Sequence, residues 1–116
     1  MITKIGTSKK IPHSRLWLEG ARLIEAGFSH ATRYDVRETL SGIVISAHAD
    51  GKRRVAGTPE RPVIDITGAI VRDNFRADFA EVVFSQNVIT AHDTAPLAAA
   101  PAAVAPAVRQ PDFFTV

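Results

Sequence analysis

An internal repeat constrains the fold of this chain more than any other feature of its sequence. Apolar residues and a Gly-Ala pair recur at a constant offset of 48 positions. The matched positions are Leu16, Leu18, Gly20, Ala21, Leu23, Tyr34 and Val36 with Ile64, Ile66, Gly68, Ala69, Val71, Val82 and Phe84. Beyond them, Ile43-Val44-Ile45 matches Val88-Ile89-Thr90 after a shorter turn. Two copies of one structural unit are therefore expected.

Each copy shows the same order of predicted elements. Alternation of apolar residues at Leu16/Leu18 and at Ile64/Ile66 predicts a half-buried strand. A short helix and a β-hairpin follow in both copies. The helices are expected over residues 19–26 and 67–75, and the hairpins over 34–39 with 43–47 and 80–84 with 88–90. One copy has too few strands to bury its apolar face, so the two together are expected to close one small barrel.

The predicted fold class is therefore mainly β with short helices (α+β), arranged as two β-α-β-β units related by pseudo-twofold symmetry. The barrel domain is expected over residues 1–90, with units at about 11–47 and 61–90 and a connecting loop over 50–60 that is rich in Gly, Pro and charge. Eight side chains are expected in its core: Leu16, Leu18, Leu23, Ile64, Ile66, Val71, Val82 and Phe84.

The last part of the chain, residues 91–116, has a different composition. Ala, Pro and Val dominate residues 95–108, where regularly spaced prolines favour a disordered, semi-rigid tether. The tether leads to a terminal apolar peptide with four candidate partner-binding residues: Gln110, Asp112, Phe113 and Phe114. This peptide resembles the bacterial sliding-clamp-binding pentapeptide, which makes the clamp the first protein partner to consider. The alternative is that Phe113 and Phe114 cover an apolar patch on the barrel itself.

Composition narrows the class of protein. The chain has 116 residues and no cysteine, which excludes disulfides and fits a reducing cytoplasm. It shows no apolar run long enough for a membrane span or a signal peptide. Its four histidines lack the spacing of metal ligands, and no phosphate-binding or nucleophile motif occurs, so neither a metal nor a cofactor is expected.

Charge is distributed unevenly along the chain. Residues 1–61 contain 11 Lys and Arg against 6 Asp and Glu, whereas residues 62–116 contain 3 against 6. The first half can therefore present a basic face to an anion such as nucleic acid. The Lys52-Arg53-Arg54 cluster, together with Lys4, Lys9 and Lys10, is suited to phosphate contacts. The alternative is that these are solvated loop charges.

Short patterns in both copies resemble the swapped-hairpin barrels of the AbrB/MazE superfamily. In the second copy these are residues 61–66, a helix with Arg72, and the strands 80–84 and 88–89. In the first copy, residues 14–28 resemble the SymE-like branch, with a leucine strand, a Gly, a helix and an Ala-Gly-Phe ending. The resemblance covers residues 11–90. It implies a DNA- or RNA-binding protein, in a toxin–antitoxin, plasmid or phage setting.

The resemblance also implies which residues contact nucleic acid. Family members carry basic residues near the first strand and in the loops, and the matching positions are Lys9, Lys10, Arg15, Lys52, Arg53 and Arg54. Members normally contribute one unit per chain and dimerise. Two units in one chain can complete the barrel alone, so a monomer or a homodimer is expected.

Binding rather than catalysis is the expected activity. A SymE-like RNA-cleaving toxin would need a general acid or base, for which Glu19, Asp65 and His13 are the candidates near the strand–helix corners. A further alternative is a phage or mobile-element adaptor or inhibitor that binds a host protein through the barrel or the C-terminal peptide.

Overall fold

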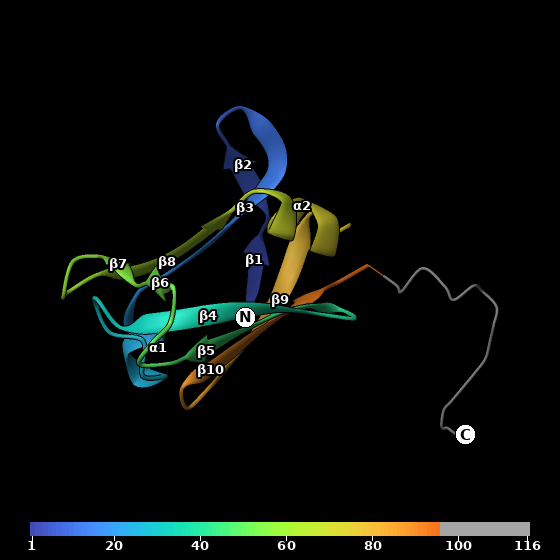
Figure 1. Cartoon of the computed structure of the whole chain (residues 1–116). Coiled ribbons are helices and arrows are strands. Elements are labelled where there is room, and N and C mark those ends of the chain that lie inside the picture. Colours follow the sequence, from blue (N-terminus) through green and yellow to red (C-terminus); the bar gives the residue numbers. More distant parts are fainter. Residues whose placement is uncertain (96–116) are drawn as a thin grey trace, which may run out of the picture.

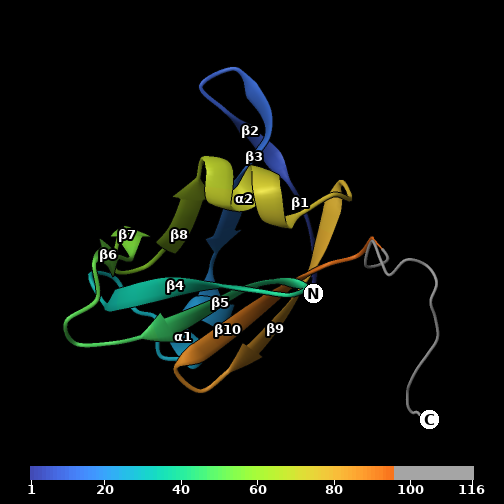
Figure 2. The same ribbon diagram turned by 45° about the vertical axis from the view of Figure 1, so that its right-hand side comes forward.

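The computed structural model describes residues 1–95, in which the chain forms ten strands and two short helices (Figures 1 and 2). The strands are β1 (Ile2–Lys4), β2 (Gly6–Ser8), β3 (Ile11–Glu19), β4 (Arg33–Thr39), β5 (Gly42–Ala47), β6 (Arg53–Arg54), β7 (Ala56–Gly57), β8 (Pro62–Thr67), β9 (Phe79–Ser85) and β10 (Val88–Asp93). The helices are α1 (Ala21–Glu25) and α2 (Ala69–Asn74). The expected mainly β fold with short helices is confirmed for these residues.

The strands form two antiparallel sheets that enclose one core. The larger sheet has the order β1-β9-β10-β5-β4-β6 and curls around the core, and the smaller has the order β2-β3-β8-β7 (Figure 1). Seven of the eight side chains expected in the core are buried: Leu16, Leu18, Leu23, Ile64, Ile66, Val71 and Val82. The prediction was wrong for Phe84, which is only partly buried and packs against the edge of the core.

Two ladders between the copies, β3–β8 and β5–β10, are each centred on a pair of residues that occupy equivalent positions in the two copies. Trp17 pairs with Asp65 at the centre of the β3–β8 ladder, and these residues are 48 positions apart. In the β5–β10 ladder, Val44 pairs with Thr90. Those two residues are also equivalent, because the β4–β5 and β9–β10 registers superpose at an offset of 46. A twofold operation that exchanges the copies therefore maps each of these ladders onto itself.

The offset of 46 corrects the expected alignment of the hairpins. Tyr34 corresponds to Ala80 and Val36 to Val82, rather than to Val82 and Phe84. The first strands of the hairpins begin at Arg33 and Phe79, so the segment from the start of the helix to the hairpin is two residues shorter in the second copy. This shortening is invisible in the apolar pattern, because a shift of two residues returns each side chain to the same face of a strand.

The repeated unit also begins earlier than expected. The segment 50–60 is not only a loop, since β6 and β7 lie within it and correspond to β1 and β2. Lys4 pairs with Phe79 as Arg54 pairs with Arg33. In each copy the chain then crosses from the larger sheet to the smaller through one buried residue, Ile5 or Val55. The N–H groups of these two residues make equivalent bonds, Ile5 to the Asp78 carbonyl (2.8 Å) and Val55 to the Thr32 carbonyl (2.9 Å).

Each copy pairs its hairpin with strands of the other copy. The β4–β5 hairpin lies between β6 and β10, both from the second copy. The β9–β10 hairpin lies between β1 and β5, both from the first. Because the backbone hydrogen bonds of each hairpin edge depend on the other half, neither half is expected to be stable alone.

Both helices are shorter than expected, and each begins after a glycine with an unusual backbone. Gly20 has φ 104° and ψ −167°, and Gly68 has φ 103° and ψ −156°. Essentially only glycine adopts this region. The glycine of the repeated Gly-Ala pair is therefore required by the backbone where the chain leaves the strand for the helix.

Replacing either glycine by alanine is expected to lower the free energy of unfolding by about 1–3 kcal/mol. A Cβ at Gly20 or Gly68 would have no atom within 4 Å, so the cost comes from the backbone conformation alone. Urea denaturation would measure it. Gly6→Ala is the matched control, because Gly6 has no positive φ and its Cβ would make ordinary contacts at 3.8 Å. Equal stability of Gly20→Ala and Gly6→Ala would contradict the backbone explanation.

Candidate nucleic-acid interface

Lys9 and Lys10 form the tip of the β2–β3 hairpin. Ser8 pairs with Ile11, so the two lysines are the loop residues, with φ values of 52° and 67°. Positive φ at both positions defines a type I′ turn, which normally takes Asn-Gly. Lysine at both positions is strained, because residues with a side chain rarely adopt positive φ. Both side chains are exposed, so two like charges lie close together in solvent. The turn therefore holds two cations together in solvent at a cost in stability.

Arg15 lies on the outer face of β3, and its guanidinium is already paired with the Asp65 carboxylate. Its guanidinium donates two hydrogen bonds to the Asp65 carboxylate, at 2.9 and 2.8 Å, and stacks 4.7 Å from the centre of the Trp17 ring. The hydrogen bonding to Asp65 raises the pKa of Arg15 above its usual value. Arg15 therefore ties β3 to β8 near the twofold axis and is less available to a phosphate than the sequence suggests.

The Lys52-Arg53-Arg54 cluster is divided between the two faces of the larger sheet. Arg53 pairs with the buried Tyr34, and Arg54 pairs with the exposed Arg33, so these adjacent arginines point to opposite sides. Burial raises the pKa of Tyr34, and the nearby charge of Arg53 opposes that rise. Lys52 lies beside Asp35, whose carboxylate accepts a hydrogen bond from the Lys52 N–H (3.1 Å).

Arg33 and Arg37 are two further cations that the sequence pattern did not single out. They alternate with Tyr34 and Val36 along β4, which places them on the outer face with Arg54. The Arg33 guanidinium donates to the Gly51 carbonyl (3.0 Å), and His48 donates its N–H to the Arg33 carbonyl (3.0 Å). Period-2 alternation on the predicted strand 34–39 was the signal for Arg37, whereas Arg33 lies one residue before that predicted strand.

Arg33, Arg37, Lys52 and Arg54 together are named the basic face. Arg33 and Arg54 oppose each other directly across the ladder, an arrangement that is destabilising for like charges. The Val55 N–H bonds to the Thr32 carbonyl, so the Arg33–Arg54 pair is of the non-hydrogen-bonded type, in which side chains come closest. Within residues 1–95, none of the four cations has a carboxylate oxygen within 4.0 Å.

The predicted basic residues do not form one continuous site. In both ribbon views the β2–β3 turn, with Lys9 and Lys10, projects away from β6 (Figures 1 and 2). The fold thus separates three groups: the Lys9–Lys10 tip, the ion-paired Arg15, and the basic face that includes Lys52 and Arg54. The partner-binding residues predicted at the end of the chain, Gln110, Asp112, Phe113 and Phe114, lie outside the described residues.

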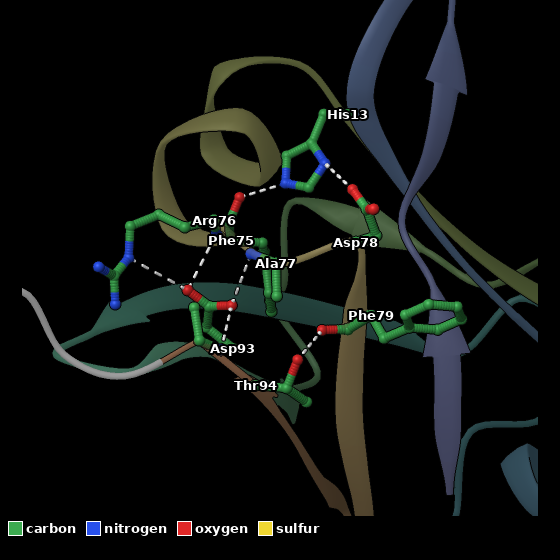
Figure 3. A network of polar contacts seen from close by, with 9 residues as sticks. His13, Phe75, Arg76, Ala77, Asp78, Phe79, Asp93 and Thr94 are labelled. Carbon is green, nitrogen blue, oxygen red and sulfur yellow. Dashed lines mark hydrogen bonds and ion pairs between the residues drawn. The ribbon is translucent and has the colours of Figure 1, made fainter.

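The three candidate acid–base residues are engaged by other groups. Asp65 accepts both hydrogen bonds from Arg15, and Glu19 lies 3.7 Å from Arg61. One ring nitrogen of His13 bonds to the Phe75 carbonyl, and the other lies 3.9 Å from Asp78 (Figure 3). These residues are not brought together at one site.

A polar network around Asp93 anchors the loop before β9 (Figure 3). The Asp93 carboxylate accepts hydrogen bonds from the N–H groups of Arg76 (2.9 Å), Ala77 (3.1 Å) and Ala95 (3.1 Å), and lies 3.5 Å from the Arg76 guanidinium. Burial by itself raises the pKa of Asp93, but these hydrogen bonds and the charge of Arg76 outweigh it, so the pKa is lowered. The interactions hold the loop in place and leave Asp93 ionised.

Comparison of the chain with known proteins finds no matching family model, no matching curated protein and no matching solved structure. Over residues 1–95, no helix is long and apolar enough to cross a membrane. In the same range, no group of three or more His, Asp or Glu side chains is placed to hold a metal ion.

Proposed function

We propose that this is a small nucleic-acid-binding protein of the swapped-hairpin barrel type, similar to AbrB/MazE proteins of the SymE-like branch. The exchange of hairpins between the two copies supports the fold assignment, because each hairpin pairs with the first and last strands of the other unit. Both units lie in one chain, so the barrel is complete without a second subunit.

The observation that carries the nucleic-acid proposal is the Arg33–Arg54 pair. Two arginines that face each other without a carboxylate between them destabilise the sheet edge, and an anion bound between them relieves the repulsion. The phosphates of a nucleic-acid backbone are such anions. Lys52, just before β6, and Arg37, on β4, add positive charge on either side of Asp35, so the basic face suits several phosphates of one strand. These contacts give salt-dependent affinity and set the orientation of the ligand, without reading the base sequence.

The Lys9–Lys10 tip supplies a second, separate contact. It projects as a narrow two-stranded ribbon, a shape that the major groove of B-form DNA admits. Nucleic acid that lies on the basic face and reaches the tip would be held at two points, which restricts its orientation more than either contact alone.

Replacing Lys9 and Lys10 by Asn and Gly is expected to separate stability from binding. Asn-Gly relieves the left-handed strain, so the free energy of unfolding should rise by about 1–2 kcal/mol. The same change removes two cations, so the salt slope of DNA binding should fall by up to about 1.8. Chemical denaturation and fluorescence anisotropy measure the two effects. A stabilised variant with unchanged DNA affinity at every salt concentration would remove the tip from the interface.

A second candidate function is a non-enzymatic adaptor or inhibitor that binds a host protein. The observation that favours it is a set of exposed apolar side chains at the other edge of the larger sheet, on β1 and β9. In this reading, a protein partner would be captured through that surface or through the C-terminal peptide, and DNA affinity would be absent even at low salt.

A further inference from the structure

The two ends of the larger sheet present equivalent positions with different chemistry. On the outer face near β1, the exposed side chains of Ile2 (58% exposed), Phe79 (48%) and Val83 (46%) form what we name the apolar patch. Ile2 pairs with Glu81, which lies between Phe79 and Val83 along β9. Figure 3 shows the Phe79 ring turned away from the polar network around Asp93, toward the side on which β1 pairs.

The symmetry of the chain maps the apolar patch onto the basic face. Ile2 corresponds to Lys52, Phe79 to Arg33, and Val83 to Arg37. The strand pairing is matched at Lys4–Phe79 and Arg54–Arg33, whereas Ile2 lies within β1 and Lys52 comes just before β6. Three cations at one end are replaced by three exposed apolar groups at the other, which is typical of a surface that is covered by another apolar group.

We propose that the apolar patch is the docking site for the C-terminal residues 109–116 of the same chain, with Phe113 and Phe114 as the apolar anchors. The chain leaves the described region beside the patch, since the Thr94 hydroxyl donates to the Phe79 carbonyl (2.8 Å; Figure 3). A Pro-rich tether from Ala95 to Phe113 spans up to about 56 Å, at about 3.1 Å per residue. The anchors can therefore fold back onto the patch without strain.

Charge around the patch complements the peptide. Lys4, paired with Phe79, can meet Asp112, and Glu81, between Phe79 and Val83, can meet Arg109. A second copy of the chain is a weaker candidate occupant, because three apolar side chains and the three-residue edge strand β1 offer little area for a stable dimer. The tethered peptide instead has a high effective concentration at the patch.

Paramagnetic relaxation in the full chain tests this proposal. The chain contains no cysteine, so Thr115→Cys takes a single nitroxide label. The amide signals of β1 and of residues 79–83 are expected to lose most of their intensity, while those of β4 and β6 keep theirs. Phe113→Ser with Phe114→Ser in the labelled chain should restore the lost signals, and so should Val83→Arg. Arg37→Ala, at the position equivalent to Val83, is the matched control and should leave the loss unchanged.

Three outcomes would overturn the proposal. Even or absent broadening would show that the peptide does not dock, and broadening centred on β4 and β6 would place it on the basic face. Broadening of isotope-labelled chain by added spin-labelled chain without isotope would assign the patch to a second copy. Because Val83→Arg lies in the folded domain, the Phe113 and Phe114 changes provide the same test without altering a residue of the barrel.

Discussion

Replacing Arg33 and Arg54 together by alanine is expected to weaken binding of duplex DNA by about 10- to 100-fold at low salt. The two side chains face each other across the β4–β6 ladder without a carboxylate among residues 1–95 to neutralise them. Their loss removes about two phosphate contacts, so the slope of log affinity against log salt should become shallower by about 1.8. Fluorescence anisotropy over a salt series measures both quantities. The folded state should be retained, because the change also removes a repulsion.

Strand alternation offers a matched control for this prediction. Arg53 is adjacent to Arg54 in sequence but lies on the opposite face, beside Tyr34. Arg54→Ala alone should lower the affinity and the salt slope, whereas Arg53→Ala should leave both nearly unchanged. Equal losses from the two substitutions would mean that net charge, and not the basic face, determines the binding.

Phe28→Ala is expected to lower the free energy of unfolding by about 3–5 kcal/mol. The Phe28 ring is fully buried and meets Tyr34 edge-on, with ring centres 6.3 Å apart. Small domains have free energies of unfolding of about 5–15 kcal/mol, so this change removes a large part of the total stability. Thermal and urea unfolding measure the loss.

The same variant tests whether the copies form one cooperative unit. Because each hairpin pairs with strands of the other copy, the second copy should lose hydrogen-exchange protection together with the first. Phe75→Ala, at the corresponding buried position of the second copy, should have a similar effect. Two separate transitions, with the second copy still protected in Phe28→Ala, would show that the halves fold independently.

The fold could be predicted in outline because the repeat carries strong signals. Apolar alternation located β3 and β8, and both helices were predicted in the right place but two residues too early, at 19 and 67 rather than at Ala21 and Ala69. The strands β1, β2, β6 and β7 are only two or three residues long, too short for any period to be visible, so the copies seemed shorter than they are. The exchange of the hairpins depends on pairing between distant segments, which no local pattern encodes.

The candidate interface was predicted less completely for a related reason. Lys52, Arg53 and Arg54 are adjacent in the sequence and were expected to act together, yet a strand directs neighbouring side chains to opposite faces. Arg33 and Arg37 were overlooked because single arginines in a strand are common, and only the register with β6 brings Arg33 against Arg54. The Arg15–Asp65 pair likewise depends on β3 and β8 lying side by side.

The salt dependence of DNA binding by the full chain tests the central claim most directly. Four cations of the basic face, with or without Lys9 and Lys10, correspond to four to six phosphate contacts. At about 0.9 per contact, log affinity should fall linearly with log salt with a slope of about −3.6 to −5.4. Fluorescence anisotropy with a labelled duplex and an unrelated second sequence would give the same slope for both. No binding at low salt, or binding that is indifferent to salt, would contradict the account.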